Sequence, residues 1–156
     1  MPRNIIEGER KNLNYPEYLQ DRLTQTAENL HIDSIDELIN DFLKIRIFVD
    51  EERLRLGDVG KEVKVMVGGI LIIEDLLIDK IPNGPLFRKN VRILGANLEK
   101  MEPIMGKLPG RENVTQYARS AIVFGLKIVE LMDQQAVPNR ELGFVIKIND
   151  EETIFI

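Results

Sequence analysis

The chain of 156 residues contains no cysteine and a single histidine, His31. The lack of thiols excludes disulfide bonds, thiolate metal sites and thiol nucleophiles, and it is typical of a reducing compartment. One histidine without cysteine cannot complete a metal site of the usual kind. We expect His31 to cap a helix or to interact with the helix dipole, and we expect no metal and no cofactor.

Long hydrophobic runs are also absent. No apolar segment approaches the ~20 residues that a membrane span needs, and the N-terminus "MPRNIIEGER" lacks the apolar core of a secretory signal. The sequence has neither a glycine-rich phosphate loop with its lysine nor a nucleophile in a recognisable elbow. These absences predict a cytoplasmic protein that has no membrane partner and is not an enzyme, although an enzyme using only Asp and Glu remains compatible with the sequence.

Positive charge is scarce overall but is concentrated in one segment. The formal net charge is −5, which argues against a protein that coats nucleic acid without selectivity. From Pro85 to Leu98, however, there is no acid, and Arg88, Lys89 and Arg92 supply three positive charges. The composition therefore leaves room for a local basic face.

Two segments of the chain share one layout. Residues 16–30 carry apolar positions on one helical face, and Ser34 with Glu37 forms a capping box ahead of a second helix. Shifted by 79 residues, Asn113 and Gln116 stand where Ser34 and Glu37 stood. Eight apolar positions match at this offset: Ile35, Leu38, Ile39, Phe42, Leu43, Ile45, Ile47 and Val49 correspond to Val114, Tyr117, Ala118, Ala121, Ile122, Phe124, Leu126 and Ile128. The pattern indicates a duplication whose copies have diverged.

The sequence predicts a hairpin after each second helix. "EVKVMVGGILII" is expected to turn at Gly68 and Gly69, and "FVIKINDEETIFI" near Asn149 and Asp150. The repeated unit is thus strand, helix, helix, hairpin. Residues 82–85, "PNGP", break regular structure, so we place the boundary near residue 83, between units 1–82 and 83–156.

Each unit begins with a strand that has one polar face. In "RKNLNYP" the period of two places Arg10, Asn12 and Asn14 on one face and Lys11, Leu13 and Tyr15 on the other. In "RKNVRI" the same parity places Arg88, Asn90 and Arg92 outward. Arginine and asparagine suit the base edges of the major groove. Because a lone strand leaves its backbone groups unpaired, we expect residues 10–15 to pair with residues 88–93 within one chain.

These residues resemble the ribbon-helix-helix DNA-binding regulators of the Arc and MetJ type. The resemblance runs from Arg10 to about Leu43, through an alternating strand that ends in Tyr15 and Pro16, an amphipathic helix and a Ser34-capped helix. Taken over both copies, the resemblance covers about two thirds of the chain. The second copy matches less closely, because Leu94 and Gly95 replace the proline and Pro103 interrupts a shorter first helix. Tandem versions of the motif, including some from archaeal viruses, are similar to this arrangement.

The resemblance implies an α+β fold of two tandem ribbon-helix-helix units, each followed by a hairpin, pairing as an intrachain pseudo-dimer. It implies base contacts from the two polar rows, which are Arg10, Asn12, Asn14, Arg88, Asn90 and Arg92. It also implies phosphate binding where each second helix begins. The candidate phosphate contacts are Lys11, Ser34, Lys89, Arg111 and Asn113.

The implied function is a sequence-specific regulator of transcription, with repression as the expected mode, that binds double-stranded DNA as a homo-oligomer of two or more chains. The alternative is an antitoxin-like interaction adaptor, which would use the same fold to oligomerise and the hairpins to bind a partner. The apolar segment "VMVGGILII" supports this alternative, because an edge-prone hairpin can add strands to another chain.

Overall fold

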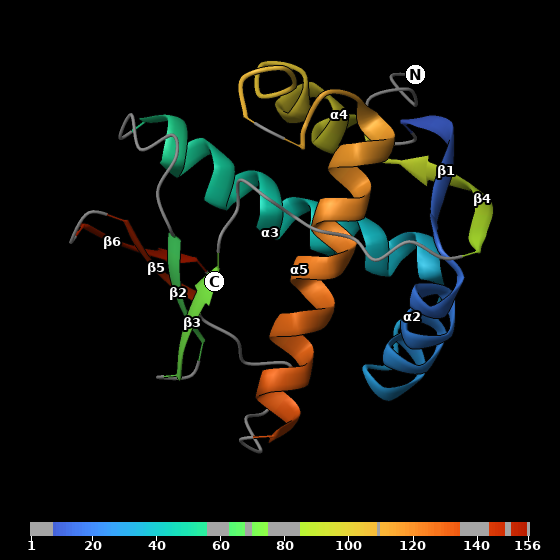
Figure 1. The fold of residues 1–156 in the computed structure, drawn as a ribbon, viewed down its shortest axis with the longest axis horizontal. Coiled ribbons are helices and arrows are strands. Elements are labelled where there is room, and N and C mark those ends of the chain that lie inside the picture. Colours follow the sequence, from blue (N-terminus) through green and yellow to red (C-terminus); the bar gives the residue numbers. More distant parts are fainter. Residues whose placement is uncertain are drawn as a thin grey trace, which may run out of the picture.

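The computed structural model, shown in Figure 1, describes residues 8–55, 63–67, 70–74, 85–108, 110–134, 144–148 and 151–155. The first half of the chain contributes β1 (Glu9–Pro16), α2 (Glu17–Asn29), α3 (Ile35–Arg55), β2 (Val63–Val67) and β3 (Ile70–Glu74). The second half contributes β4 (Leu86–Ile93), α4 (Gly95–Met101), α5 (Val114–Gln134), β5 (Phe144–Ile148) and β6 (Glu151–Phe155). The order strand, helix, helix, hairpin occurs twice, as predicted, in a mixed α+β fold. Within the described ranges, no helix has the length and apolar content required to cross a membrane.

The first sheet is an antiparallel ribbon of two strands, β1 and β4, from opposite halves of the chain (Figure 1). Its register sets Arg10 opposite Arg92, Asn12 opposite Asn90 and Asn14 opposite Arg88. The predicted intrachain pairing of these two segments is therefore confirmed. Each strand supplies the backbone partners that the other requires.

The second sheet joins the two hairpins. Its strand order is β3-β2-β5-β6, with every neighbouring pair antiparallel. The predicted pairing within each hairpin is confirmed, and the additional pairing of β2 with β5 was not foreseen. The predicted turns at residues 68–69 and 149–150, and the predicted boundary near residue 83, lie outside the described residues.

The helix ends follow local signals in the sequence. The Ser34 Oγ accepts a hydrogen bond from the Glu37 amide at 3.1 Å, and the Asn113 Oδ1 accepts one from the Gln116 amide at 2.9 Å. These bonds satisfy amide groups that have no partner within the helix. At the other end of α2, His31 has a φ of 58°, and its amide and the next one return to the last helical turn. The backbone of His31 therefore forms the left-handed terminus of α2, which agrees with its predicted place at the helix end.

The hydrophobic core lies between the ribbon and the helices. The ribbon contributes Leu13, Tyr15, Val91 and Ile93; the helices and the segment after α4 contribute Leu19, Leu23, Ala27, Leu38, Ile39, Phe42, Leu43, Ile47, Met101, Ile104, Leu108, Tyr117, Ala118, Ala121, Ile122 and Leu126. Helices α3 and α5 pack together so closely at one point that a β-carbon on Gly125 would collide with the Phe42 ring. Each copy of the repeat thus completes the core of the other.

Helix α4 is the shorter first helix that the sequence of the second copy predicted. It ends at Met101, two residues before Pro103, and residues 102–107 continue as turns. Leu94 precedes it without a side-chain cap. The proline ends the helix because it lacks the amide hydrogen that a further turn would use.

Candidate nucleic-acid interface

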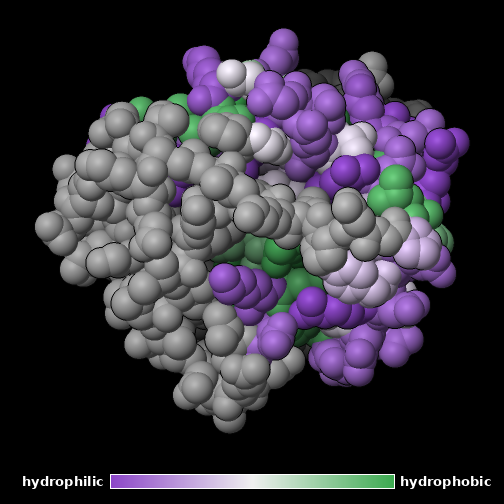
Figure 2. Space-filling model, viewed as in Figure 1, coloured by the Kyte–Doolittle hydropathy of each residue, from purple (hydrophilic) through white to green (hydrophobic). Residues whose placement is uncertain are grey.

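The outer face of the ribbon carries the polar rows that the sequence predicted. Arg10, Asn12, Arg88 and Asn90 are exposed, whereas Leu13, Tyr15, Val91 and Ile93 are fully buried on the opposite face. Asn14 and Arg92 lie near the strand ends and are partly buried. The predicted parity of both strands is confirmed. Figure 2 shows hydrophilic residues over much of the side of the molecule on which the ribbon lies.

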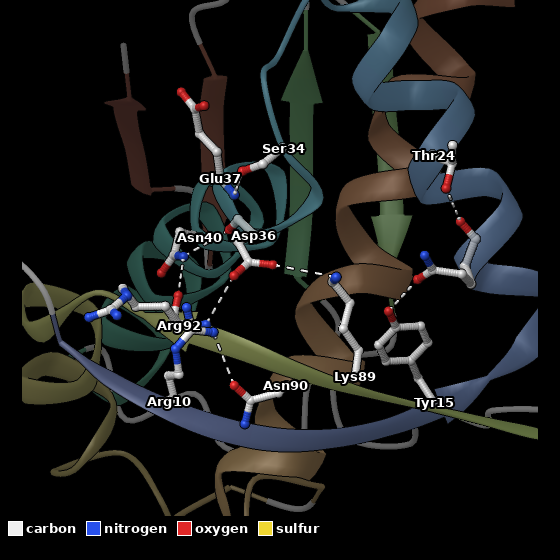
Figure 3. Close-up of polar contacts among 11 residues, drawn as sticks. Arg10, Tyr15, Thr24, Ser34, Asp36, Glu37, Asn40, Lys89, Asn90 and Arg92 are labelled. Carbon is white, nitrogen blue, oxygen red and sulfur yellow. Dashed lines mark hydrogen bonds and ion pairs between the residues drawn. The ribbon is translucent and has the colours of Figure 1, made fainter.

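Hydrogen bonds connect the outward side chains across the two strands. Arg10 donates from Nη1 to the Asn90 Oδ1 at 3.0 Å, a contact drawn in Figure 3. Asn90 in turn donates from Nδ2 to the Asn12 Oδ1 at 3.0 Å. At the far end, Arg88 donates from Nε to the Asn14 Oδ1 at 3.3 Å. We call these three bonds the ribbon ladder.

The ribbon has local two-fold pseudosymmetry. Residues 78 positions apart are equivalent in the two copies, and Asn12 pairs directly with its own equivalent, Asn90. The symmetry breaks at the ends, where Asn14 in one strand corresponds to Arg92 in the other. One end of the ribbon consequently carries two opposed arginines, Arg10 and Arg92, and the other carries Arg88 opposite Asn14.

Helix α3 holds β4 through two polar side chains near its N-terminus. Asp36 accepts a hydrogen bond from the Arg92 amide at 3.2 Å and lies 3.8 Å from the Lys89 Nζ (Figure 3). Asn40 is 5% exposed; its Nδ2 donates to the Arg92 carbonyl at 2.9 Å, and its Oδ1 accepts from the Leu94 amide at 2.9 Å. Because these side chains bind backbone atoms at the end of β4, they fix the position of the strand on α3.

Helix α5 holds β1 in the matching way. Thr115 donates from Oγ1 to the Asn12 carbonyl at 3.4 Å, and Arg119 donates from Nε to the Asn14 carbonyl. Thr115 and Arg119 are the positional equivalents of Asp36 and Asn40, 79 residues further along. None of these four residues was predicted as part of the site. The signal in the sequence that could have indicated them is a polar residue that interrupts the apolar stripe of a helix.

An open groove of about 510 Å³ lies where α5 begins beside β1. Its lining includes Lys11, Asn12, Asn113, Thr115 and Arg119. The first turn of α5 contains no acidic residue, whereas that of α3 contains Asp36 and Glu37. The two helix entrances that flank the ribbon therefore differ in charge, and the α5 entrance is the one that suits an anion.

The predicted lysines lie at the sides of the ribbon. Lys11 is 36% exposed and pairs with Glu9 at 3.0 Å, and Lys89 is 28% exposed and pairs with Asp36. Pairs this accessible to solvent contribute little to stability. Both ammonium groups can therefore exchange a carboxylate for another anion at small cost. Ser34 and Asn113 are exposed at the two helix entrances.

The prediction that Arg111 binds a phosphate is wrong for this structure. Its side chain is 0% exposed, with Nε 3.2 Å from the Oδ2 of Asp50, which is also 0% exposed. A buried guanidinium needs such a partner because desolvation of an isolated charge is expensive. Arg111 instead joins α3 to the start of α5, and the sequence offered no sign that Asp50 would be its partner.

Two buried tyrosines have raised pKa values. Burial, assisted by the negative charge of Asp36, raises the pKa of Tyr15 to about 12. Burial also raises the pKa of Tyr117 far above its usual range, and the negative charge of Asp50 adds to this effect. Both hydroxyls stay neutral at physiological pH, as their inward positions require.

Comparison with known proteins finds no significant match to a protein family, a curated protein or a solved structure. Among the side chains that the structure describes, no three of His, Cys, Asp and Glu are grouped as a metal site requires.

Proposed function

We propose that this protein is a sequence-specific double-stranded DNA-binding regulator of transcription, made of two tandem ribbon-helix-helix units that act as an intrachain pseudo-dimer. The observation that carries the proposal is the exposed arginine and asparagine row on a two-stranded ribbon. The major groove admits a two-stranded ribbon, and these side chains suit the base edges found there. The helices support the ribbon, and no enzymatic step is proposed.

Phosphate contacts would come from both sides of the ribbon. Lys11 and Lys89 flank it, and the α5 entrance offers Asn113 and Thr115 beside Lys11. Such contacts hold the protein in register without reading sequence. Ser34 and Asn113 each accept a hydrogen bond from one amide of the first turn, but the first turn of α3 carries Asp36 and Glu37 whereas that of α5 carries no acid. We therefore propose that the α5 entrance binds a phosphate more strongly than the α3 entrance.

The test is a titration of labelled duplex DNA with the full chain, followed by fluorescence anisotropy at several salt concentrations. Nuclease protection of the DNA upstream of the protein's own coding sequence would supply a candidate site. Arg92→Ala should weaken binding by about 1–3 kcal/mol on the preferred site and relax the preference at one base pair. The matched control is Arg55→Ala, because Arg55 is exposed at the C-terminal end of α3, outside the ribbon, where it pairs with Glu52.

An equal loss of affinity on the preferred and altered sites would show that Arg92 does not read sequence. Failure of the unmodified chain to bind any duplex at low salt would refute the proposed function itself. Nonspecific binding alone would also count against it, because the proposal requires discrimination between sequences.

The adaptor alternative rests on the hairpins, and the strand order weakens it. Strands β2 and β5 pair with each other in one sheet, so one edge of each hairpin is already occupied within the chain. Only β3 and β6 are outer strands of that sheet. Retention on heparin at low salt distinguishes the two functions, because the regulator should be retained despite the sequence pI of about 5.1 and the adaptor should not.

We also propose that two or more chains bind together. One ribbon contacts only a few base pairs, which is too little sequence to define a site among ~10⁶ or more competitors. Deletion of residues 143–156 should reduce oligomer size or binding cooperativity if the hairpins mediate assembly. Sedimentation with and without DNA measures both quantities, and unchanged values would remove the hairpins from this role.

A further inference from the structure

The ribbon ladder engages every amide oxygen on the outer face of the ribbon in one hydrogen bond. The three outward asparagines are Asn12, Asn14 and Asn90, and each Oδ1 accepts a hydrogen bond from a neighbouring side chain. The donors that the ladder does not use are the amide hydrogens of Asn12 and Asn14, the second amide hydrogen of Asn90, and the remaining guanidinium hydrogens of Arg10 and Arg88. Guanidinium groups are donors only, whereas an asparagine amide carries both a donor and an acceptor.

We infer that the ribbon presents a surface of hydrogen-bond donors and selects guanine, with thymine second, rather than adenine. The inference rests on the proposed function. Guanine shows two acceptors in the major groove, N7 and O6, and thymine shows O4. Adenine read by asparagine requires an Oδ1 that accepts from N6 while Nδ2 donates to N7. In the ladder that oxygen already accepts a hydrogen bond along the ribbon, so only its second lone pair is left for a base and the paired geometry with adenine is disfavoured.

The ladder also assigns a positioning role to Asn90. It lies at the pseudosymmetry centre opposite Asn12, accepts from Arg10 and donates to Asn12. It thereby fixes the amide orientation of Asn12, with the oxygen toward the ribbon and the nitrogen available to a base. Asn90 thus controls which base its neighbour can contact, in addition to any contact of its own.

The experiment is selection of binding sites from a random duplex library by the full chain, followed by base-analogue substitution in the selected site. The expected site has guanines at the positions facing the ribbon. Replacing them with 7-deazaguanine, which lacks N7, should weaken binding about tenfold. Replacing adenines with purine, which lacks the 6-amino group, should change affinity by less than about twofold, since the amino group is not used.

Asn90→Ala provides the second arm, because it releases the Asn12 Oδ1. The variant should accept adenine at the central position at which the unmodified chain prefers guanine. The matched control is Asn29→Ala, an exposed asparagine at the end of α2, which should select the original site.

A selected site with central adenines whose 6-amino groups are required would overturn the inference while leaving DNA recognition intact. An unchanged preference in Asn90→Ala would overturn the positioning role. If the chain enriches no sequence at all, the proposed function fails and the inference falls with it.

Discussion

Arg111 allows a direct test of the burial described above, because a phosphate contact and a buried ion pair predict different results. The perturbation is Arg111→Met, which keeps an unbranched side chain and removes the guanidinium. Asp50 would then remain fully buried without the nitrogen atoms that now lie 3.2 and 3.4 Å from its oxygens. Removing one member of a buried pair costs about 3–5 kcal/mol, since the other charge stays desolvated.

Urea denaturation measures this loss, and a decrease in unfolding free energy of about 3–5 kcal/mol is expected. The double change Arg111→Met with Asp50→Leu should recover most of it, because apolar residues often replace a buried pair at little cost. The control is Lys107→Met, which removes an exposed positive charge on the preceding loop and should change stability by less than about 0.5 kcal/mol.

The salt dependence of DNA binding tests the alternative, in which Arg111 contacts a phosphate. Loss of one phosphate contact would make the slope of log affinity against log salt shallower by about one unit. We expect no such change for Arg111→Met under conditions in which circular dichroism shows it folded. A shallower slope together with a stability loss below about 1 kcal/mol would refute the buried pair and return Arg111 to the DNA surface.

Three further perturbations test the packing that supports the ribbon. Asn40→Ala should lower the unfolding free energy by about 2–3 kcal/mol, because buried backbone groups lose their partner. Urea denaturation measures this loss, and Asn29→Ala is the exposed control. Equal losses in the two variants would contradict the role of Asn40 in holding β4. Gly125→Ala should destabilise the folded protein by about 1–3 kcal/mol in thermal unfolding, because the new methyl group meets the Phe42 ring. This loss is expected despite the better helix propensity of alanine. A more stable variant would show that α3 and α5 can move apart without cost. The raised pKa of Tyr15 stabilises the fold fully below pH 10, and this contribution should be lost as the pH rises toward about 12, because the unfolded chain ionises first. Tyr15→Phe should reduce that alkaline loss in a pH series of denaturation curves, and an unchanged pH profile would exclude Tyr15 as its source.

The sequence by itself determined the features that depend on neighbouring residues. A period of two placed Leu13 and Tyr15 inside and Arg10 and Asn12 outside, because successive side chains of a strand point to opposite faces. Capping residues located the starts of α3 and α5, since a side chain must satisfy the amides of the first turn within a few residues. The duplication was visible because both copies preserve the same local spacing.

Only the tertiary structure decided which distant groups meet. Asn40 and Arg119 look like breaks in apolar stripes until each helix contacts the strand of the opposite copy, 52 and 105 residues away along the chain. Arg111 looked like a surface cation until Asp50, 61 residues earlier, was placed against it. Burial of a charge depends on whether the fold delivers a counter-charge, and the ribbon ladder depends on the register of two strands. Both are properties of long-range packing, which local periodicity and capping do not encode.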